Sequence, residues 1–472
     1  MKTNFSHSPW LILALLLTAC APLAPAPAIT PSATSVPSST PTLPPTETPT
    51  PTPAPQQPPA CTFPLEQTMM EESKPEEYTF SEPRVVLSAP NSTFSISEWL
   101  PDSQRILIKR TVVEQARKKY DSMELFNPTK IKTQTYAKLK PRSYDLPVWV
   151  SGLEGVLYQE LIAEPASYDT EGNYIPPSSD IAHMLLVLSQ DGSNNATTID
   201  DSQYNHWRNT RDIHPTWVFS SLAVKPDGNE IVYLKASSEI YQFYRRKVSQ
   251  GQFSAEQLLP IGADMLKNYN VIQYEMAWRP YTEQIFFAGH DGTGNIQSFL
   301  FDMSTGKSCI LDFRGSSLGS RHQPLYARWS PSGRYLAIVR GNGGFPVDSI
   351  DLAVLDIATG DLFTLALPPI TNGVHFVWDV AWAPDNYHIA VIGKITGFFH
   401  CGPNCIEDTY GLYLVDFISG KVDLVFPSFQ FSGGDVGHNL AWSPDGTKIL
   451  ANCSVENAGR LCLISVQRTP QP

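Results

Sequence analysis

Long apolar runs, positive charge and helical periodicity are all scarce in this 472-residue sequence. After residue 20, no segment has 18 consecutive apolar residues, so we expect no membrane-spanning helix there. The 34 lysines and arginines are outnumbered by 46 acidic residues, which gives a formal net charge of −12. This balance argues against nucleic acid and against anionic lipid as the main partner. Almost no stretch spaces its apolar residues as a helix does, which indicates an all-β chain.

The first twenty residues are typical of an export signal. Lys2 supplies a positive charge, and the apolar run Trp10–Leu17 is shorter than the roughly 20 residues that a membrane-spanning helix needs. The run ends in Leu17-Thr18-Ala19-Cys20, which resembles the lipobox of bacterial lipoproteins. The resemblance implies cleavage before Cys20 and a lipid on its sulfur, which would hold the protein at the outer leaflet of the cell membrane or at an outer membrane. An ordinary signal peptide with a coincidental cysteine is the alternative.

Residues 21–60 form a Pro/Thr-rich segment with 14 of the chain's 41 prolines and a single charge, at Glu47. This composition cannot bury a core and favours extended polyproline II, a semi-rigid spacer of about 3.1 Å per residue. We therefore divide the chain into a signal peptide, a lipidated cysteine with its stalk, an N-terminal extension and a long C-terminal part, which cover residues 1–19, 20–60, 61–83 and 84–472.

The last of these parts repeats one hairpin motif: an apolar strand that ends in Trp, a Pro-Asp-Gly type of turn, and a second strand. The turn residues supply the fixed φ and the positive φ that a short hairpin needs. Six copies begin at Trp99, Val224, Trp278, Trp329, Trp382 and Trp442. Trp149 lies 50 residues after Trp99, at the repeat spacing, and begins a seventh copy in which Ser-Gly-Leu-Glu-Gly replaces the usual turn.

A second turn motif, Asp-x-x-Ser/Thr-Gly, begins at Asp302, Asp356 and Asp416. Four short strands per unit of about 50 residues are typical of a β-propeller blade. We predict an all-β, seven-bladed β-propeller of four-stranded blades, with six or eight blades as alternatives. The last repeat supplies three strands, so we expect the N-terminal strand Arg84–Leu87 to complete this blade and close the ring. The stalk would then enter at the seam of the ring.

The Trp-Ser-Pro-Asp-Gly hairpin followed by Asp-x-x-Ser/Thr-Gly resembles the TolB-type, WD-like propeller repeat over about residues 84–468. The resemblance implies the fold but not the function, because the stalk stands where TolB carries an α/β domain. With this fold, the repeated Trp side chains are expected to pack between blades.

Six cysteines remain besides Cys20, an even number that suits an oxidising compartment. Cys453 and Cys462 flank a predicted hairpin loop, and Cys401 and Cys405 enclose a turn sequence. The third pair would fix the end of the stalk to the edge of a blade, and it consists of Cys61 and Cys309. A metal site built from His400, Cys401 and Cys405 is the alternative, but the spacing does not match a paired-CxxC zinc site.

Four histidines, His214, His322, His375 and His438, lie in connections that lead into the first strand of a blade. Because that strand lines the central channel of a propeller, these side chains could converge and bind a divalent metal or an anion. Some TolB-like propellers are polysaccharide lyases with a histidine-held metal at this location, which the sequence resembles only loosely. Solvated loop histidines are the alternative, and no cofactor is predicted.

The longest connections are expected to share one face of the propeller, where binding usually occurs on a rigid scaffold. The binding candidates on these loops are His206, Trp207, Arg208, Arg314, Arg321, His322, His375, His400 and His438. We expect a monomeric binding or scaffold module for a glycan, peptide or protein, joined to the membrane by its lipid, with no nucleic-acid partner. A metal-assisted, lyase-like carbohydrate enzyme at the channel mouth and a purely structural envelope protein are the alternatives. No catalytic residue is assigned.

Overall fold

The computed structural model describes the strands and turns of a nearly all-β unit, the second of two compact units of the chain, Pro55–Pro472. The described residues are 60–62, 75–114, 117–139, 146–162, 167–168, 174–175, 181–190, 196–205, 222–236, 241–259, 269–270, 276–291, 296–311, 322–342, 350–365, 367, 376–396, 409–429, 437–453 and 458–470. Within these ranges, no helix has the length and apolar character that crossing a membrane requires.

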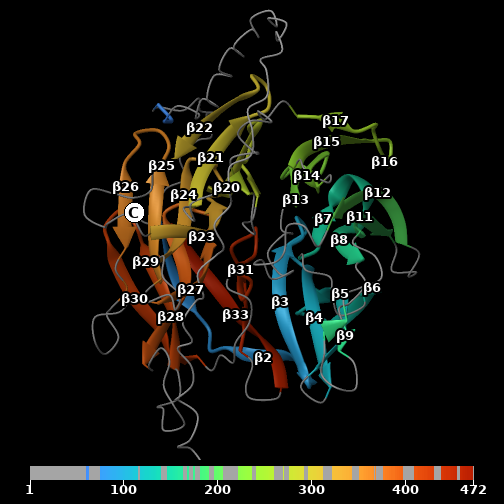
Figure 1. Ribbon diagram of the computed structural model, residues 1–472. Coiled ribbons are helices and arrows are strands. Elements are labelled where there is room, and N and C mark those ends of the chain that lie inside the picture. Colours follow the sequence, from blue (N-terminus) through green and yellow to red (C-terminus); the bar gives the residue numbers. More distant parts are fainter. Residues whose placement is uncertain are drawn as a thin grey trace, which may run out of the picture. The chain divides into compact units, whose positions relative to one another are not determined.

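Seven four-stranded blades form a ring, which confirms the predicted seven-bladed propeller (Figure 1). Blade 1 contains β3 (Ser92–Trp99), β4 (Ile106–Glu114), β5 (Arg117–Asn127) and β6 (Lys132–Leu139). Blade 2 contains β7 (Val148–Val150), the 3-10 helix η1 (Ser151–Leu153), β8 (Gly155–Ile162), β11 (Ile181–Gln190) and β12 (Ala196–Asn205), with a separate hairpin of β9 (Ser167–Tyr168) and β10 (Tyr174–Ile175). Blade 3 contains β13 (Leu222–Val224), β14 (Glu230–Ala236) and β15 (Tyr241–Ser249), which pairs with both β16 (Gln252–Phe253) and β17 (Gln257–Leu258). Trp149 therefore begins a true blade.

In the remaining four blades, as in the first three, the strands are named from the inside of the ring outward. Blade 4 contains β18 (Tyr269–Asn270), β19 (Ala277–Trp278), β20 (Gln284–Asp291), β21 (Ile296–Asp302) and β22 (Lys307–Leu311). Blade 5 contains β23 (His322–Trp329), β24 (Tyr335–Asn342), β25 (Ile350–Asp356) and β26 (Leu362–Leu365). Blade 6 contains β27 (Val377–Trp382), β28 (His388–Thr396), β29 (Thr409–Asp416) and β30 (Lys421–Phe429). Blade 7 contains β31 (Leu440–Trp442), β32 (Lys448–Asn452), β33 (Ala458–Pro470), β1 (Glu76–Phe80) and β2 (Arg84–Pro90).

The ring is closed by residues from both ends of the propeller sequence. β33 pairs with β32 on one side, and with β1 and β2 on the other, from Glu76 opposite Pro470 to Pro90 opposite Ala458. Figure 1 shows the blue β2 beside the red β33. The predicted closing strand is confirmed, and it is longer than the expected Arg84–Leu87 because β1 continues it beyond a short interruption at residues 81–83.

An apolar cluster fills each interface between neighbouring blades, so the described part of the ring contains seven such clusters. The repeated Trp of a blade packs against the blade before it, as predicted. Three of these indoles also donate a hydrogen bond to a carbonyl of that preceding blade, in the pairs Trp99–Ala441, Trp329–Ala277 and Trp382–Arg328. These clusters bury the large side chains that stabilise the ring.

Disulfides join Cys453 to Cys462 and Cys61 to Cys309, whereas Cys401 and Cys405 lie outside the described residues. Cys309 lies on β22, and the N–H of Cys61 donates to the Ile310 carbonyl at 2.9 Å. The expectation that the upstream chain meets the ring at its seam is therefore wrong. It meets the ring at blade 4, because the closing strand begins only at Glu76 and residues 60–62 attach elsewhere.

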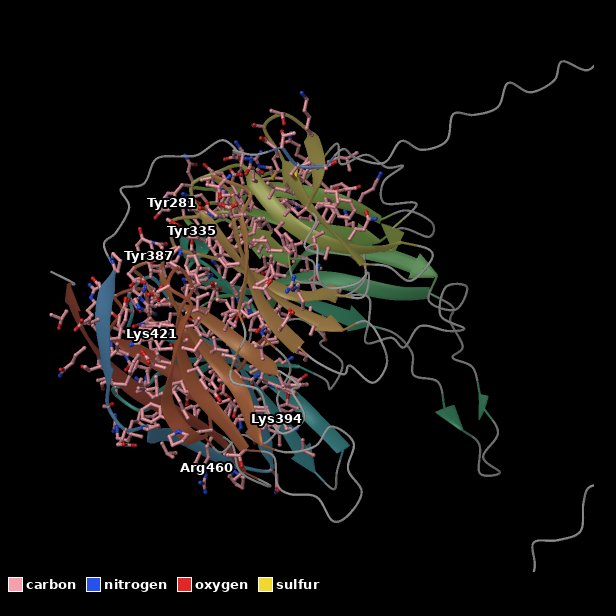
Figure 2. All side chains as sticks on the ribbon, turned by 90° about the vertical axis from the view of Figure 1, so that its left-hand side faces the viewer. Tyr281, Tyr335, Tyr387, Lys394, Lys421 and Arg460 are labelled. Carbon is pink, nitrogen blue, oxygen red and sulfur yellow. A yellow bond between two sulfur atoms is a disulfide. The ribbon has the colours of Figure 1, made fainter. Side chains whose placement is uncertain are left out.

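The two ends of the blades differ in their connections. Turns between the first and second strands, and between the third and fourth, are short and lie at one end, with Gly228, Gly333 and Gly446 at positive φ. At Gly333 a side chain would lie 2.8 Å from the Pro280 carbonyl oxygen, so glycine is required for space as well. The longer connections lie at the other end. Figure 2 shows Tyr281, Tyr335 and Tyr387 at the short-turn end, and Lys394 and Arg460 at the long-connection end.

Candidate functional site

Most of the binding and metal candidates from the sequence lie outside the described residues. These are His206, Trp207, Arg208, His214, Arg314, Arg321, His375 and His400. The backbone of His322 begins β23, where it pairs with Asn342. Of the four histidines expected near the channel, only His438 has a described side chain, so their convergence stays a prediction. In the described ranges, no three His, Cys, Asp or Glu side chains are placed to hold a metal ion.

His438 lies directly before β31, at the long-connection end of blade 7. Its carbonyl accepts the N–H of Ile96 at 2.7 Å, which links blade 7 to blade 1. Its Nδ1 is buried and has no hydrogen-bond partner among the described residues. Burial, followed by the charges of Arg328 and Lys109, lowers the pKa of His438 well below its ordinary value. The imidazole is therefore neutral near pH 7.

Asp379 on β27 is the buried carboxylate beside this histidine segment. Its oxygens accept hydrogen bonds from the backbone N–H groups of Val380 at 2.7 Å and Leu440 at 2.8 Å, and from that of Asn439. The Tyr326 hydroxyl donates a further bond at 3.2 Å. Burial raises the pKa of Asp379 to about 6, although the nearby Arg328 and the backbone donors lower it. Asp379 therefore ties the first strands of blades 5, 6 and 7 together.

Arg328 on β23 completes this group, which we call the inner-strand cluster: Tyr326, Arg328, Asp379, His438 and Asn439. The Arg328 guanidinium lies 5.2 Å from the centroid of the Tyr326 ring and donates to the Gly437 carbonyl at 2.7 Å. Because both oxygens of Asp379 already accept hydrogen bonds, the cluster is organised for rigidity more than for proton transfer. The sequence indicated His438 but gave no signal for Asp379, whose partners come from three blades.

A hollow of about 600 Å³ lies at the short-turn end between blades 1 and 2, the end opposite to the predicted binding face. Asp102 pairs with Arg105 at 2.6 Å, and the Arg105 guanidinium lies 5.9 Å from the centroid of the Trp149 ring. The Gln190 amide donates to the Leu153 carbonyl at 2.7 Å. One wall is η1, where Ser-Gly-Leu-Glu-Gly replaces the usual turn. In the sequence, this hollow is indicated only by the replacement of the Pro-Asp-Gly turn at residues 151–155.

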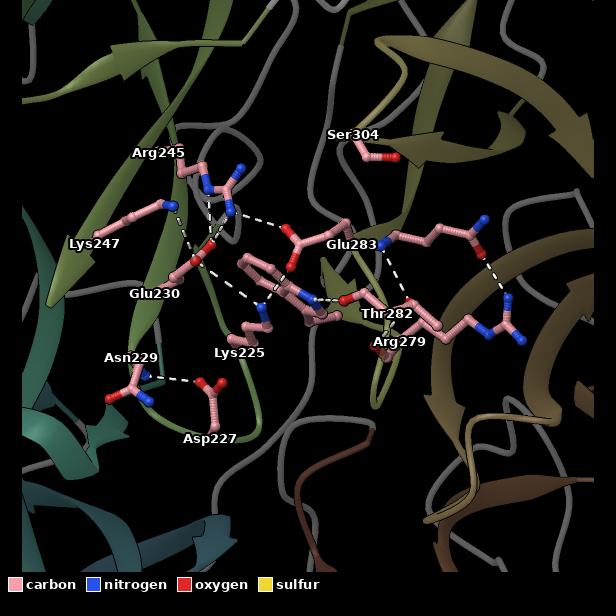
Figure 3. A network of polar contacts seen from close by, with 12 residues as sticks. Lys225, Asp227, Asn229, Glu230, Arg245, Lys247, Arg279, Thr282, Glu283 and Ser304 are labelled. Carbon is pink, nitrogen blue, oxygen red and sulfur yellow. Dashed lines mark hydrogen bonds and ion pairs between the residues drawn. The ribbon is translucent and has the colours of Figure 1, made fainter. Parts of the chain in front are cut away.

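An ionic network joins blade 3 to Glu283 of blade 4 (Figure 3). Glu283 pairs with Lys225 at 2.5 Å and with Arg245 at 2.8 Å, and Arg245 also pairs with Glu230. The Lys225 ammonium lies 5.6 Å from the centroid of the Trp278 ring. Every charged member is paired within the network, so its arrangement supports the interface and leaves no free group for chemistry.

No protein-family model and no curated protein matches the chain. Among solved structures, an oligogalacturonate lyase in complex with manganese is similar at 12% identity and a TM-score of 0.50, over 84% of this chain and 99% of that one. TolB from Acinetobacter baumannii is similar at 15% identity and a TM-score of 0.37, over 80% of this chain and 82% of that one. The propeller domain of Cps50 (Swd1) from Myceliophteria thermophila is similar at 10% identity and a TM-score of 0.46, over 80% and 99%. At these identities, the similarity shows the propeller fold alone.

Proposed function

We propose that the chain is an extracytoplasmic binding or scaffold module, held at a membrane by a lipid on Cys20. Residues 20–60 would act as its stalk, and the ligand would be a glycan, peptide or protein. The observation that carries this proposal is the pair of disulfides, Cys61–Cys309 and Cys453–Cys462. Disulfides form and persist in secreted and envelope proteins and are rare in the cytosol, so they support export.

Binding is assigned to the long-connection end of the blades. Seven buried interfaces and a closing strand make the ring a rigid support, and loops on a rigid support commonly carry binding residues. Connections 343–349 and 397–408, among others, join strands at this end. The acidic net charge favours a neutral or basic ligand over a polyanion.

Membrane attachment is tested by metabolic labelling with palmitate in a bacterial host. We expect the wild-type chain to be labelled and to sediment with membranes, and Cys20→Ser to lose both properties. Cys309→Ser is the matched control, because it removes a cysteine without touching the lipobox. Equal labelling of the wild type and Cys20→Ser would disprove the lipid anchor.

The binding face is tested with the full chain on arrays of glycans, peptides and envelope proteins. The triple variant His206→Ala, Trp207→Ala, Arg208→Ala should lose at least tenfold in affinity for any ligand found. Lys421→Ala with Asp423→Ala, an exposed pair at the short-turn end, should bind as the wild type does. The opposite result would move the binding site to the short-turn end. A metal that survives dialysis and is lost in His322→Ala or His375→Ala would favour the enzyme alternative instead.

A further inference from the structure

The chain is fastened to the ring at two separate places. The first is the closing strand, where β1 and β2 pair with β33. The second is the disulfide Cys61–Cys309, which joins the residues before β1 to β22, the outer strand of blade 4. Both cysteines also pack against the apolar cluster shared by blades 4 and 5. A force on the residues before Cys61 therefore reaches blade 4 first.

The closing strand is poorly placed to resist such a force alone. β1 is the outermost strand of blade 7, and its first residue, Glu76, pairs with Pro470 at the end of β33. Because antiparallel hydrogen bonds run perpendicular to the strands, drawing this end outward would break them one pair after another. Loss of β1 and β2 would leave an unpaired edge on β33 and remove Val86 from the cluster between blades 7 and 1.

When the same force acts through Cys309, it is applied at a point of blade 4 that resists it better. Cys309 lies in the middle of β22, opposite Leu300, with the pairs Phe301–Ser308 and Phe299–Ile310 on either side of it. A force applied at the middle of a strand is shared by the pairs on both sides of that point. The Ala60–Ile310 bridge and the Cys61 hydrogen bond add a local attachment.

We infer that Cys61–Cys309 is a mechanical clamp: it transfers tension on the N-terminal segment to blade 4 and keeps the closing strand unloaded. The clamp rests on the proposed function only for the source of the tension, a membrane-held stalk. Reduction of this one disulfide would convert a pull on the stalk into opening of the ring at its seam.

Magnetic tweezers test the clamp on the full chain carrying Cys20→Ser, so that no lipid takes part. One handle is fused to the N-terminus, and the other is inserted in the exposed turn between Thr129 and Lys130 of blade 1. In the chain that also carries Cys61→Ser and Cys309→Ser, the first extension step should release Glu76–Pro90. Those 15 residues span about 50 Å when extended, at ~3.3–3.6 Å per residue. In the disulfide-bonded chain, this step should be absent at the same force.

Two further measurements keep the test decisive. Hydrogen exchange at the Glu77 and Thr79 amides, which face β33, shows without force whether the variant ring is closed, and if it is not, the wild-type chain is reduced while it is held. The variant Cys453→Ser, Cys462→Ser is the matched control, because its lost disulfide lies within blade 7 and leaves the path of force unchanged. A first step of the same size and force with and without Cys61–Cys309 would overturn the clamp, whether or not Cys20 carries a lipid.

Discussion

The interface between blades 2 and 3 and the interface between blades 5 and 6 are stabilised by different side chains. Between blades 5 and 6, Phe417 lies 4.8 Å from Tyr335, 5.5 Å from Trp382 and 5.8 Å from Phe363, measured between ring centroids. Blade 3 begins with Val224 where most copies have Trp, and its cluster with blade 2 contains no indole among the described residues. The residue at this position of the repeat thus determines whether an indole fills the gap.

An ionic group borders the interface between blades 2 and 3. Asp200 of blade 2 accepts a hydrogen bond from the Tyr233 hydroxyl at 2.6 Å, and pairs with Lys235 at 2.9 Å and with Arg246 at 3.3 Å. Glu256 pairs with the same two cations. Burial of aromatic surface depends little on pH or salt, whereas partly exposed ion pairs depend on both. The two interfaces should therefore respond to different conditions.

The largest effect is expected from Phe417→Ala in the aromatic interface. Phe417 is 1% exposed and contacts three rings, so its removal leaves a cavity and should lower the free energy of unfolding by about 3–5 kcal/mol. Urea denaturation followed by tryptophan fluorescence measures this loss. Ile418→Ala, at a neighbouring residue that is 51% exposed, is the control and should change little. Equal losses for both variants would contradict the aromatic account of this interface.

Asp379 is a charged group by which pH should affect the aromatic side of the ring. Its pKa is raised to about 6 from 3.8 in the folded state, so the folded protein binds the proton more tightly than the unfolded chain. The contribution of Asp379 to stability should therefore be greatest below pH 4 and be lost as the pH rises to 6, by on the order of 3 kcal/mol. In Asp379→Asn this contribution disappears, and thermal unfolding scans across that range should show a flatter profile. An unchanged slope in the variant would rule out Asp379 as its source.

The repeat could be predicted from the sequence because each hairpin is local. Trp149 predicts blade 2 by its spacing from Trp99 and by the strand that follows it, and Arg84–Leu87 is recognisable as a strand without a neighbour in its own repeat. The features that the sequence does not predict depend on residues far apart: β1 pairs with β33 at the other end of the propeller sequence, and Asp379 finds its partners on three blades. The Cys61–Cys309 pair, obtained by elimination, already predicts attachment at the edge of the blade that carries Cys309, and entry at the seam is the expectation that the structure corrects.

A smaller loss is expected from Asp200→Asn, which tests the ionic interface. Burial opposes ionisation of Asp200, but hydrogen bonds from Tyr233 and Lys235 outweigh it and lower the pKa of this carboxyl below 3.8. The charge thus stabilises the protein above pH 4, and the benefit is lost as the pH falls through the lowered pKa. Chemical denaturation should show a loss of about 2 kcal/mol at pH 7 that shrinks under acid. This trend is opposite to that of Asp379, and a pH-independent loss would contradict it.

The smallest effect is expected from Glu283→Gln, which weakens the network between blades 3 and 4. The Glu283 side chain is 34% exposed, so solvent screens its pairs with Lys225 and Arg245, and the loss should be about 1 kcal/mol at low ionic strength. Because the Debye length falls from about 10 Å at 0.1 M salt to about 3 Å at 1 M, the difference between wild type and variant should shrink across that range. Denaturation midpoints at both salt concentrations measure it. Asp423→Asn, which breaks the exposed Lys421–Asp423 pair, should show no measurable change at either concentration. A Glu283 loss that persists at 1 M would contradict the ionic account of this interface.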